Sequence, residues 1–373
     1  MPAHRRLHQA SGALLAAMLV MLLAAMLMLS PGCGDDPAAP ANDLWADVTL
    51  PALGRSGVVG IAARGSRVVA VGVEKSAASP ATFAVQTTGG AWRVLALPAT
   101  PANAVFLDVA FAAGGEAVIV GGMPAEHPVV LDERTGWSAT ILPAAGFLFA
   151  AAAGDGDSLL AVGVASGGLT ALGVAPGAWV TDHAGFTTPQ EKGLVDVTFA
   201  NSTFVACGWD DATLTPVLRR LDSTGWKDVP GPGSAVIPEI REEFYAVWLE
   251  PDGSLWLGGT TIESTGGTEV FSARLARRPA SGDWLEIVLP SAGAAEAVND
   301  ILRAADGSVY LACGRTAARV LRWNGMTWQE EQPAIPGQFL ALAETANGAV
   351  YAAGVQRWAP GQERPLIRVR RPF

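Results

Sequence analysis

Short apolar runs separated by glycine-containing turns repeat along the chain from residue 45 to the end. Each repeat holds two near-continuous apolar runs, then an alternating run, then a segment that starts with tryptophan. Near-continuous runs are typical of strands buried on both faces, and alternating runs of strands with one polar face. Four short strands per repeat, with a period of about 45 residues, predict a β-propeller. The repeated tryptophans are Trp45, Trp92, Trp137, Trp179, Trp226, Trp284 and Trp328.

The first tryptophan segment, Trp45 to Pro51, has no repeat before it, and the last repeat, Phe339 to Phe373, has no such segment after it. We therefore predict that strand 45–51 joins the last blade beside residues 365–370. An open ring would expose sheet edges that can pair with other chains, and this exchange covers one of them. The predicted fold is all-β: a seven-bladed β-propeller of four-stranded antiparallel blades over residues 44–373.

Glycines and cysteines mark one position of the repeat. The second strand of each repeat ends on a glycine, and the turn before that strand contains Asp-Gly or Asn-Gly in several repeats, which suits tight hairpins. Cys207 and Cys313 occupy the residue before this glycine, where other repeats have valine or alanine, so we expect buried small residues rather than a disulfide. The glycines are Gly72, Gly121, Gly163, Gly208, Gly258, Gly314 and Gly354.

Residues 252–260, with the sequence Asp-Gly-Ser-Leu-Trp-Leu-Gly-Gly-Thr, resemble a phrase in the propeller repeats of bacterial two-component sensors. The Thr-Gly-Trp turns at Trp137 and Trp226 look like degenerate Asp-box (BNR) repeats and like photosystem II assembly factor-like propellers. The resemblance implies a seven-bladed β-propeller. It implies no single activity, because such propellers include sialidases, adhesins, assembly factors and sensors.

The N-terminus reads as an export and anchoring signal. A basic start and an uncharged apolar run from Ala13 to Leu29 predict a secretion signal over residues 1–32. Cys33 resembles the lipidated cysteine of a bacterial lipoprotein, and residues 33–43 read as a lipidated tether. An uncleaved membrane helix is the alternative. Both versions place the protein in the bacterial cell envelope, anchored to a membrane and facing the periplasm or the cell surface.

The net charge and the spacing of possible metal ligands limit the classes of partner and site that we expect. The net charge is −10, and residues 1–32 hold two arginines and no acid, so removing them makes the chain more acidic. This disfavours nucleic acid as a partner. His127 and His183 lack companions at metal-ligand spacing, Asp155 and Asp157 fit a hairpin turn, and we read Asp210 and Asp211 as a solvated pair.

No catalytic, cofactor or metal residues are predicted. The Phe/Tyr-Arg-Ile/Val-Pro motif of sialidases is absent from the sequence, and core packing explains Tyr245, Tyr310 and Tyr351. We therefore expect no cofactor and favour a non-enzymatic role.

The connections that follow the second and fourth strands of each repeat are long and uneven, as at Gly259 to Glu269 and Glu330 to Gln338, whereas the other connections are short. Irregular loops on a rigid scaffold are where recognition usually occurs. We predict a binding face there; the residues chosen are Trp209, Asp210, Asp211, Glu242, Glu243, Trp358 and Arg364.

We thus expect a monomeric, membrane-anchored binding or scaffold module for a protein or glycan partner. A glycan-acting enzyme of sialidase type and a helper in envelope assembly are the alternatives. Carboxylates and arginines converging on the central channel would favour the enzyme, and an apolar channel would favour the binding module.

Overall fold

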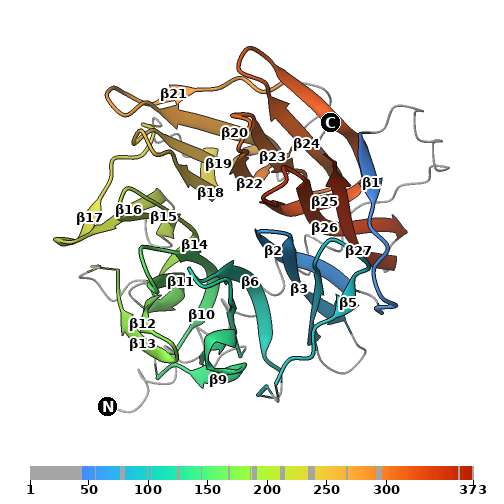
Figure 1. Ribbon diagram of the computed structural model, residues 1–373. Coiled ribbons are helices and arrows are strands. Elements are labelled where there is room, and N and C mark those ends of the chain that lie inside the picture. The colour runs from blue at the N-terminus through green and yellow to red at the C-terminus, as the bar shows by residue number, and fades with distance from the viewer. Residues whose placement is uncertain are drawn as a thin grey trace.

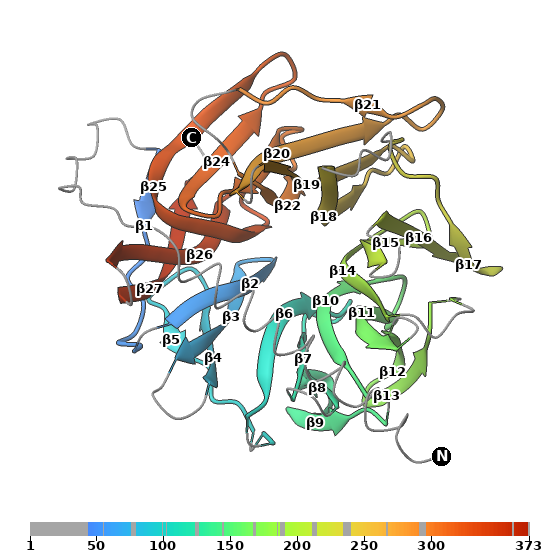
Figure 2. The same ribbon diagram turned by 180° about the vertical axis from the view of Figure 1, so that it is seen from behind.

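The structure is a computed structural model that describes residues 44–371, apart from residues 55, 76–79, 99, 102, 124–126, 144, 167–168, 185, 187–190, 211–214, 234–239, 266–267, 291–295 and 360–361. The predicted signal (1–32), Cys33 and the tether (33–43) lie outside the described residues. Strands run around a central axis, and the first strand of each blade lies innermost (Figures 1 and 2).

The blades follow one another in chain order, as predicted. Blade 1 consists of β2 (Ser56–Arg64), β3 (Arg67–Lys75), β4 (Pro80–Thr87) and β5 (Arg93–Val94). Blade 2 consists of β6 (Val105–Phe111), β7 (Ala117–Gly122), β8 (Pro128–Asp132) and β9 (Ser138–Ile141), with a 3₁₀ turn η1 (Glu133–Thr135) between the last two strands. Blade 3 consists of β10 (Phe147–Ala153), β11 (Leu159–Ser166), β12 (Leu169–Ala175) and β13 (Ala178–Asp182).

Blade 4 consists of β14 (Glu191–Ala200), β15 (Thr203–Asp210), β16 (Thr215–Asp222) and β17 (Gly225–Asp228). Blade 5 consists of β18 (Ile240–Leu249), β19 (Leu255–Thr265), β20 (Thr268–Arg278) and β21 (Leu285–Glu286). Blade 6 consists of β22 (Val298–Arg303), β23 (Val309–Cys313), β24 (Ala317–Trp323) and the first part of β25 (Trp328–Glu344). The second part of β25 opens blade 7, which continues with β26 (Val350–Ala359), β27 (Gln362–Arg370) and β1 (Trp45–Asp47).

The predicted closure of the ring is confirmed. β1 pairs antiparallel with β27, with Trp45 opposite Arg370 and Asp47 opposite Arg368, so the first and last strands of the described chain lie side by side in one blade (Figure 1). The strand is shorter than the predicted 45–51: it ends at Asp47, followed by one further bond from Val48 N to Ile367 O of 2.9 Å. The chain leaves the pairing there because it must cross from the outer edge of blade 7 to the inner strand of blade 1.

Several predicted loops are strands instead. β25 runs without interruption through the predicted loop 330–338, and β19 and β20 continue through most of the predicted loop 259–269. The prediction was wrong because residues such as Thr260, Thr261 and Ile262 were taken as irregular, although β-branched residues favour extended pairing. Blade 5 therefore carries an extended hairpin where an irregular loop was expected.

Packing between neighbouring blades forms the core. Each main apolar cluster combines side chains from two adjacent blades, as with Phe106 of blade 2 and Val71 of blade 1. Cys207 and Cys313 are fully buried free thiols, as predicted. In blade 5 the residue equivalent to Gly208 is Gly259 rather than the predicted Gly258, and in blade 6 it is Cys313 rather than Gly314, because these residues lie opposite the residue before the register shift in the first strand. Cys207 and Cys313 therefore do not share one repeat position, contrary to the prediction.

The short turns on one face are cross-linked around the ring. Hydrogen bonds join each blade to the next through Arg64 Nη2 to Ala113 O (2.9 Å), Arg134 Nη1 to Asp157 O (2.8 Å), Ser202 Oγ to Asp155 Oδ2 (2.5 Å), Asn201 Nδ2 to Pro251 O (2.7 Å), Arg303 Nη1 to Glu250 Oε1 (3.0 Å), Ala305 N to Glu344 Oε2 (2.8 Å) and Ala346 N to Gly65 O (2.8 Å). We call this the short-turn face.

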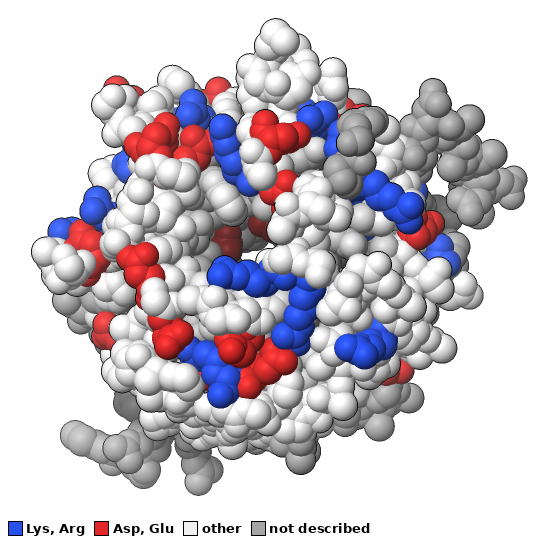
Figure 3. All heavy atoms as spheres, in the orientation of Figure 1, with Lys and Arg blue, Asp and Glu red and all other residues white. Residues whose placement is uncertain are grey.

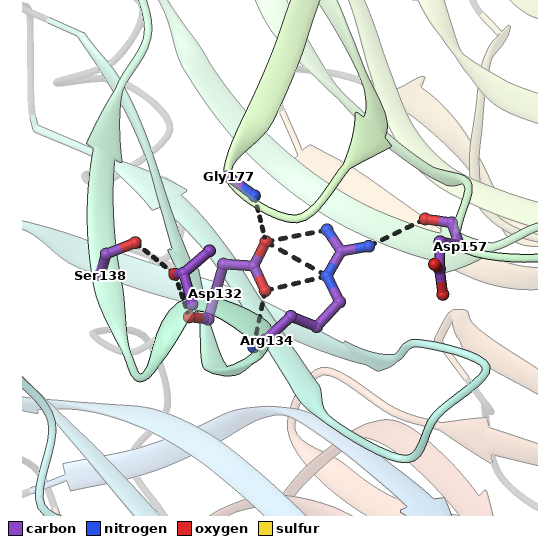
Figure 4. A network of polar contacts seen from close by, with 6 residues as sticks. Asp132, Arg134, Ser138, Asp157 and Gly177 are labelled. Carbon is purple, nitrogen blue, oxygen red and sulfur yellow. Dashed lines mark hydrogen bonds and ion pairs between the residues drawn. The ribbon is translucent and has the colours of Figure 1, made fainter.

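The link between blades 2 and 3 starts from an arginine that forms a buried ion pair with Asp132 (Figure 4). Arg134 donates to both oxygens of Asp132, and Gly177 N donates to Asp132 Oδ2 at 3.1 Å. Burial raises the pKa of Asp132, but the bonds from Arg134 and Gly177 outweigh it and hold this pKa below its usual value. The opposite face, which carries the longer connections, is called the loop-rich face below.

Within the described residues, no helix is long and apolar enough to cross a membrane.

Candidate functional site: the axis and the loop-rich face

Three aspartates lie on innermost strands in alternating blades. Asp108, Asp196 and Asp300 come from β6, β14 and β22, each directly after a register shift in its strand. The matching position in the other blades holds a small residue: Gly60, Ala150, Ala246 and Ala341. Acidic and basic side chains also surround a central hollow in the space-filling view (Figure 3).

Each of these carboxylates joins its own blade to the next one. Asp196 accepts from Val197 N in its own strand and from Val247 N in blade 5, both at 2.7 Å. Asp300 accepts from Ile301 N at 2.7 Å and from Leu342 N in blade 7 at 2.6 Å. Asp108 accepts from Ala151 N in blade 3 at 2.9 Å. The three side chains therefore act as clamps between blades.

Burial dominates the electrostatics of these aspartates. It raises the pKa of both Asp108 and Asp196 to about 7, although the backbone N–H donors pull in the opposite direction. The pKa of Asp300 is also raised well above its usual value by burial, with repulsion from Asp196 and Asp108 adding to the shift. The three groups are thus close enough to influence one another.

A second group of polar side chains lies on the loop-rich side, between blades 5 and 6. Tyr245, at the register shift of β18, donates its hydroxyl to Glu243, which also forms an ion pair with Arg241 (Nε to Oε1, 2.9 Å). The guanidinium of Arg315 lies 3.5 Å from the ring centroid of Phe271 in β20. We call Arg241, Glu243, Tyr245, Phe271 and Arg315 the blade 5–6 cluster.

The loop that carries Arg315 is held firmly. Glu296 accepts from Arg315 N at 2.8 Å and from Thr316 N at 2.5 Å, so its carboxylate fixes the backbone of this loop. Burial raises the pKa of Tyr245 well above its usual value, and the charge of Glu243 adds to that shift. Tyr245 therefore stays protonated and donates a hydrogen bond, which corrects the prediction that it is a core residue.

The structure separates the predicted binding residues. Trp209 is in strand β15 rather than in a loop, and its ring lies half-buried 6.3 Å from Phe149 of blade 3. Asp210 is only 7% exposed, so its interpretation as half of a solvated pair was wrong, and Asp211 lies outside the described residues. Trp358 is in strand β26, again not in a loop.

The remaining predicted residues keep polar partners. Glu242 forms an ion pair with Arg274 across blade 5, and Arg364 donates to Gln356 at 2.8 Å through Nε. Glu242 and Glu243 of blade 5 follow Trp209 of blade 4 around the ring, whereas Trp358 and Arg364 belong to blade 7. Of the predicted set, Glu243 alone belongs to the blade 5–6 cluster.

Sequence reasoning missed the three aspartates and most of the blade 5–6 cluster. A signal for the aspartates is present: the first strands of blades 2, 4 and 6 contain Asp-Val or Asp-Ile where the others contain Gly or Ala followed by an aliphatic residue. No comparable signal links Arg315 to Phe271 or Tyr245, because Arg315 lies in a loop of blade 6 that is far in sequence from the two strands of blade 5 that hold the other residues.

The chain matches no family model and no curated protein. Solved structures do resemble it. YCF48 bound to a D1 peptide has 18% identity and a TM-score of 0.57, covering 90% of this chain and 99% of that one. A catalytically inactive virginiamycin B lyase from Staphylococcus aureus with quinupristin has 12% identity and a TM-score of 0.59, covering 87% and 98%.

The WD40 repeats of RRP9 have 12% identity and a TM-score of 0.57, covering 89% of this chain and 98% of that one. At these identities the three likenesses establish the propeller fold alone.

Proposed function

We propose that this protein is a binding propeller that recognises a protein partner through the loop-rich face, centred on the blade 5–6 cluster. The observation that carries the proposal is the environment of the Arg315 side chain. Its half-buried guanidinium rests on Phe271, and no carboxylate among the described residues forms an ion pair with it. A planar guanidinium held on an aromatic ring is pre-organised to bind a carbonyl or carboxylate oxygen of a partner.

The contrast between the two faces supports this placement. Hydrogen bonds brace the short-turn face from blade to blade around the ring. The loop-rich side also has bonds between blades, such as Thr260 Oγ1 to Glu296 O (2.7 Å), but it adds extended hairpins and an arginine whose guanidinium contacts a ring. Binding residues on a rigid scaffold concentrate where the connections vary.

The enzymatic alternative gains less support. Carboxylates do approach the axis, as the enzyme reading required, but Asp196 and Asp300 each use both oxygens to accept backbone N–H groups. Such bonds suit a clamp between blades better than a nucleophile or proton donor. Among the solved structures, the YCF48 propeller is bound to a peptide, which agrees with a protein partner rather than a glycan.

The envelope location remains part of the proposal. The features that support it are the apolar run Ala13 to Leu29 and Cys33 after it. Trp45 begins the outermost strand of blade 7, so a tether attached there would enter the fold at the rim. A lipid anchor at Cys33 would then leave the blade 5–6 cluster available to a partner in the same compartment, including one that this protein helps to assemble.

A pull-down from envelope membranes tests the proposal. The bait is the mature domain with its tether replaced by an affinity tag, compared with Arg315→Ala and Tyr245→Phe. We expect one dominant protein to be captured, and Arg315→Ala to reduce its capture about tenfold or more, since loss of a central arginine contact typically costs at least ~1.4 kcal/mol.

Arg93→Ala is the matched control, because Arg93 is an exposed arginine on the outer strand of blade 1. It should capture the partner like the wild type, and circular dichroism should show that all variants fold. A partner captured equally well by Arg315→Ala and the wild type would remove the blade 5–6 cluster from the binding surface.

A further inference from the structure

The third strand of blade 5 has a long uncovered edge. On its inner side β20 pairs with β19 along its whole length, from Arg278 opposite Leu255 to Thr268 opposite Thr265, without a bulge. On its outer side β21 pairs with Ala276 and Arg277 only, and Ile287 N adds a bond to Leu275 O. Within the described chain, residues 268–274 therefore have no strand on their outer side.

The other blades protect the equivalent strand. A proline stands at or near the start of four of these strands, where it removes a hydrogen-bond donor from the edge. In the remaining two blades, β12 and β24 are covered along almost their whole length by β13 and β25. The four prolines are Pro80 in β4, Pro128 in β8, Pro216 in β16 and Pro365 in β27.

The uncovered part of β20 has neither protection. Residues 268–274 read Thr-Glu-Val-Phe-Ser-Ala-Arg, without proline or lysine. Val270 is 51% exposed, and Phe271 is held beneath Arg315 of the next blade. A strand edge whose outward backbone groups have no neighbouring strand is a template for pairing with another chain.

The charge on this hairpin selects between possible occupants. Glu269 in β20 and Glu263, opposite Val270 in β19, are both exposed, and neither forms an ion pair with another described residue. The two residues lie on opposite faces of the hairpin, and Arg274, the basic residue of this stretch, is paired with Glu242 and Glu286. Each face of the hairpin therefore carries a carboxylate that no base of the stretch neutralises. A second copy would bring the same two carboxylates, while its Arg274 is already engaged by Glu242 and Glu286, so it would supply no cation to pair with them. A strand with basic side chains would be stabilised there instead.

We propose that the outer edge of β20, residues 268–274, docks an extended segment of a partner protein as an added β-strand, and that this segment alternates basic and apolar residues. The inference rests on the proposed function and names the kind of partner. Main-chain hydrogen bonds supply the pairing, while the acidic side chains select the partner segment.

Synthetic peptides test this edge directly. The probe is a short end-capped peptide of alternating valine and lysine, compared with its counterpart that has glutamate in place of lysine. Fluorescence anisotropy on the mature domain should show about tenfold or greater preference for the lysine peptide. Amide hydrogen exchange should slow at residues 268–274 when that peptide is present.

Charge reversal provides the decisive variant. Glu263→Lys combined with Glu269→Lys should reverse the preference towards the glutamate peptide. Asp283→Lys, which changes an exposed carboxylate in the turn between β20 and β21, is the matched control and should leave the preference unchanged. Because both sites are exposed, the fold should survive, and circular dichroism checks this.

Three results would overturn the inference. The first is an unchanged peptide preference in the double variant, and the second is slowed exchange at strands other than β20. The third is concentration-dependent self-association abolished by Val270→Lys, which would make a second copy the occupant. If membrane capture depends on Arg315 but not on Glu263 and Glu269, the proposed function stands and the docking edge is wrong.

Discussion

At the scale of single residues, the three axial aspartates combine two opposing effects. Their backbone hydrogen bonds hold Asp196 to Val247 and Asp300 to Leu342, in the next blade around the ring. Burial and mutual repulsion disfavour the negative charge that makes those bonds strong. The strength of these hydrogen bonds between blades therefore depends on whether the aspartates are protonated.

We expect acidic conditions to strengthen the fold through these groups. The pKa of Asp196 in the folded protein, about 7, lies above its usual value of 3.8, so folding binds its proton more tightly. This contribution to the free energy of unfolding is complete below pH ~4 and is lost as pH rises to about 7. Denaturant unfolding between pH 5 and 8, approximate limits around this window, should show a decline that Asp196→Asn makes shallower.

Asp228→Asn is the control, since the Asp228 side chain is 86% exposed, although it forms an ion pair with the buried Arg219 of the same blade. It should keep the slope of the wild type. If Asp196→Asn has the same slope as the wild type, Asp196 does not titrate in this range.

At the scale of elements, one irregularity repeats in every blade. The first strand shifts register once, as between Leu148 and Ala150 in β10, and a glycine in the second strand of most blades faces that shift. At Gly163 a methyl group would overlap the carbonyl oxygen of Phe147. The glycine is thus required by close approach of two backbones.

Gly163→Ala should lower the free energy of unfolding by roughly 3 kcal/mol, because one strand must move to make room in a tightly packed sheet. Thermal and denaturant unfolding measure the loss. Gly231→Ala serves as control, since a methyl group at Gly231 meets no atom within 4 Å, and it should change stability little. A loss at Gly163 no larger than at Gly231 would contradict the close approach.

At the scale of the whole molecule, the seam in blade 7 decides whether the ring is closed. Trp45 is 1% exposed and meets the ring of Tyr310 edge-on, 6.5 Å between centroids. Arg368 donates to Trp45 O at 2.9 Å and pairs with Asp47. Trp45 thus joins the beginning of the fold to blades 6 and 7, unlike the half-buried tryptophans of other repeats.

Trp45→Ala should therefore cost about 3–5 kcal/mol, the usual loss for removing a large buried aromatic side chain. Trp284→Ala is the matched comparison: Trp284 holds the same repeat position but is only half-buried and donates to Pro230 O. Chemical denaturation should show the larger loss at Trp45. Equal losses would mean that the seam contributes no more than an ordinary blade edge.

Local patterns along the sequence predicted the strands, most of the glycine positions and the blade order, because alternation, turn residues and repeat spacing act over a few residues. The missing last strand also predicted the closure by Trp45. The lengths of the connecting hairpins were not predictable with the same rules, as β19, β20 and β25 show, because extension there depends on pairing with a neighbour.

By itself, the sequence determined the propeller architecture, the buried cysteines and the strand that closes the ring, since each follows from repetition within one chain. The tertiary structure alone decided that Asp108, Asp196 and Asp300 clamp neighbouring blades, that Arg315 rests on Phe271, and that β20 keeps an uncovered edge. The physical reason is distance along the chain: these features arise from contacts between separate strands or blades, and no local pattern encodes which strand edge is covered.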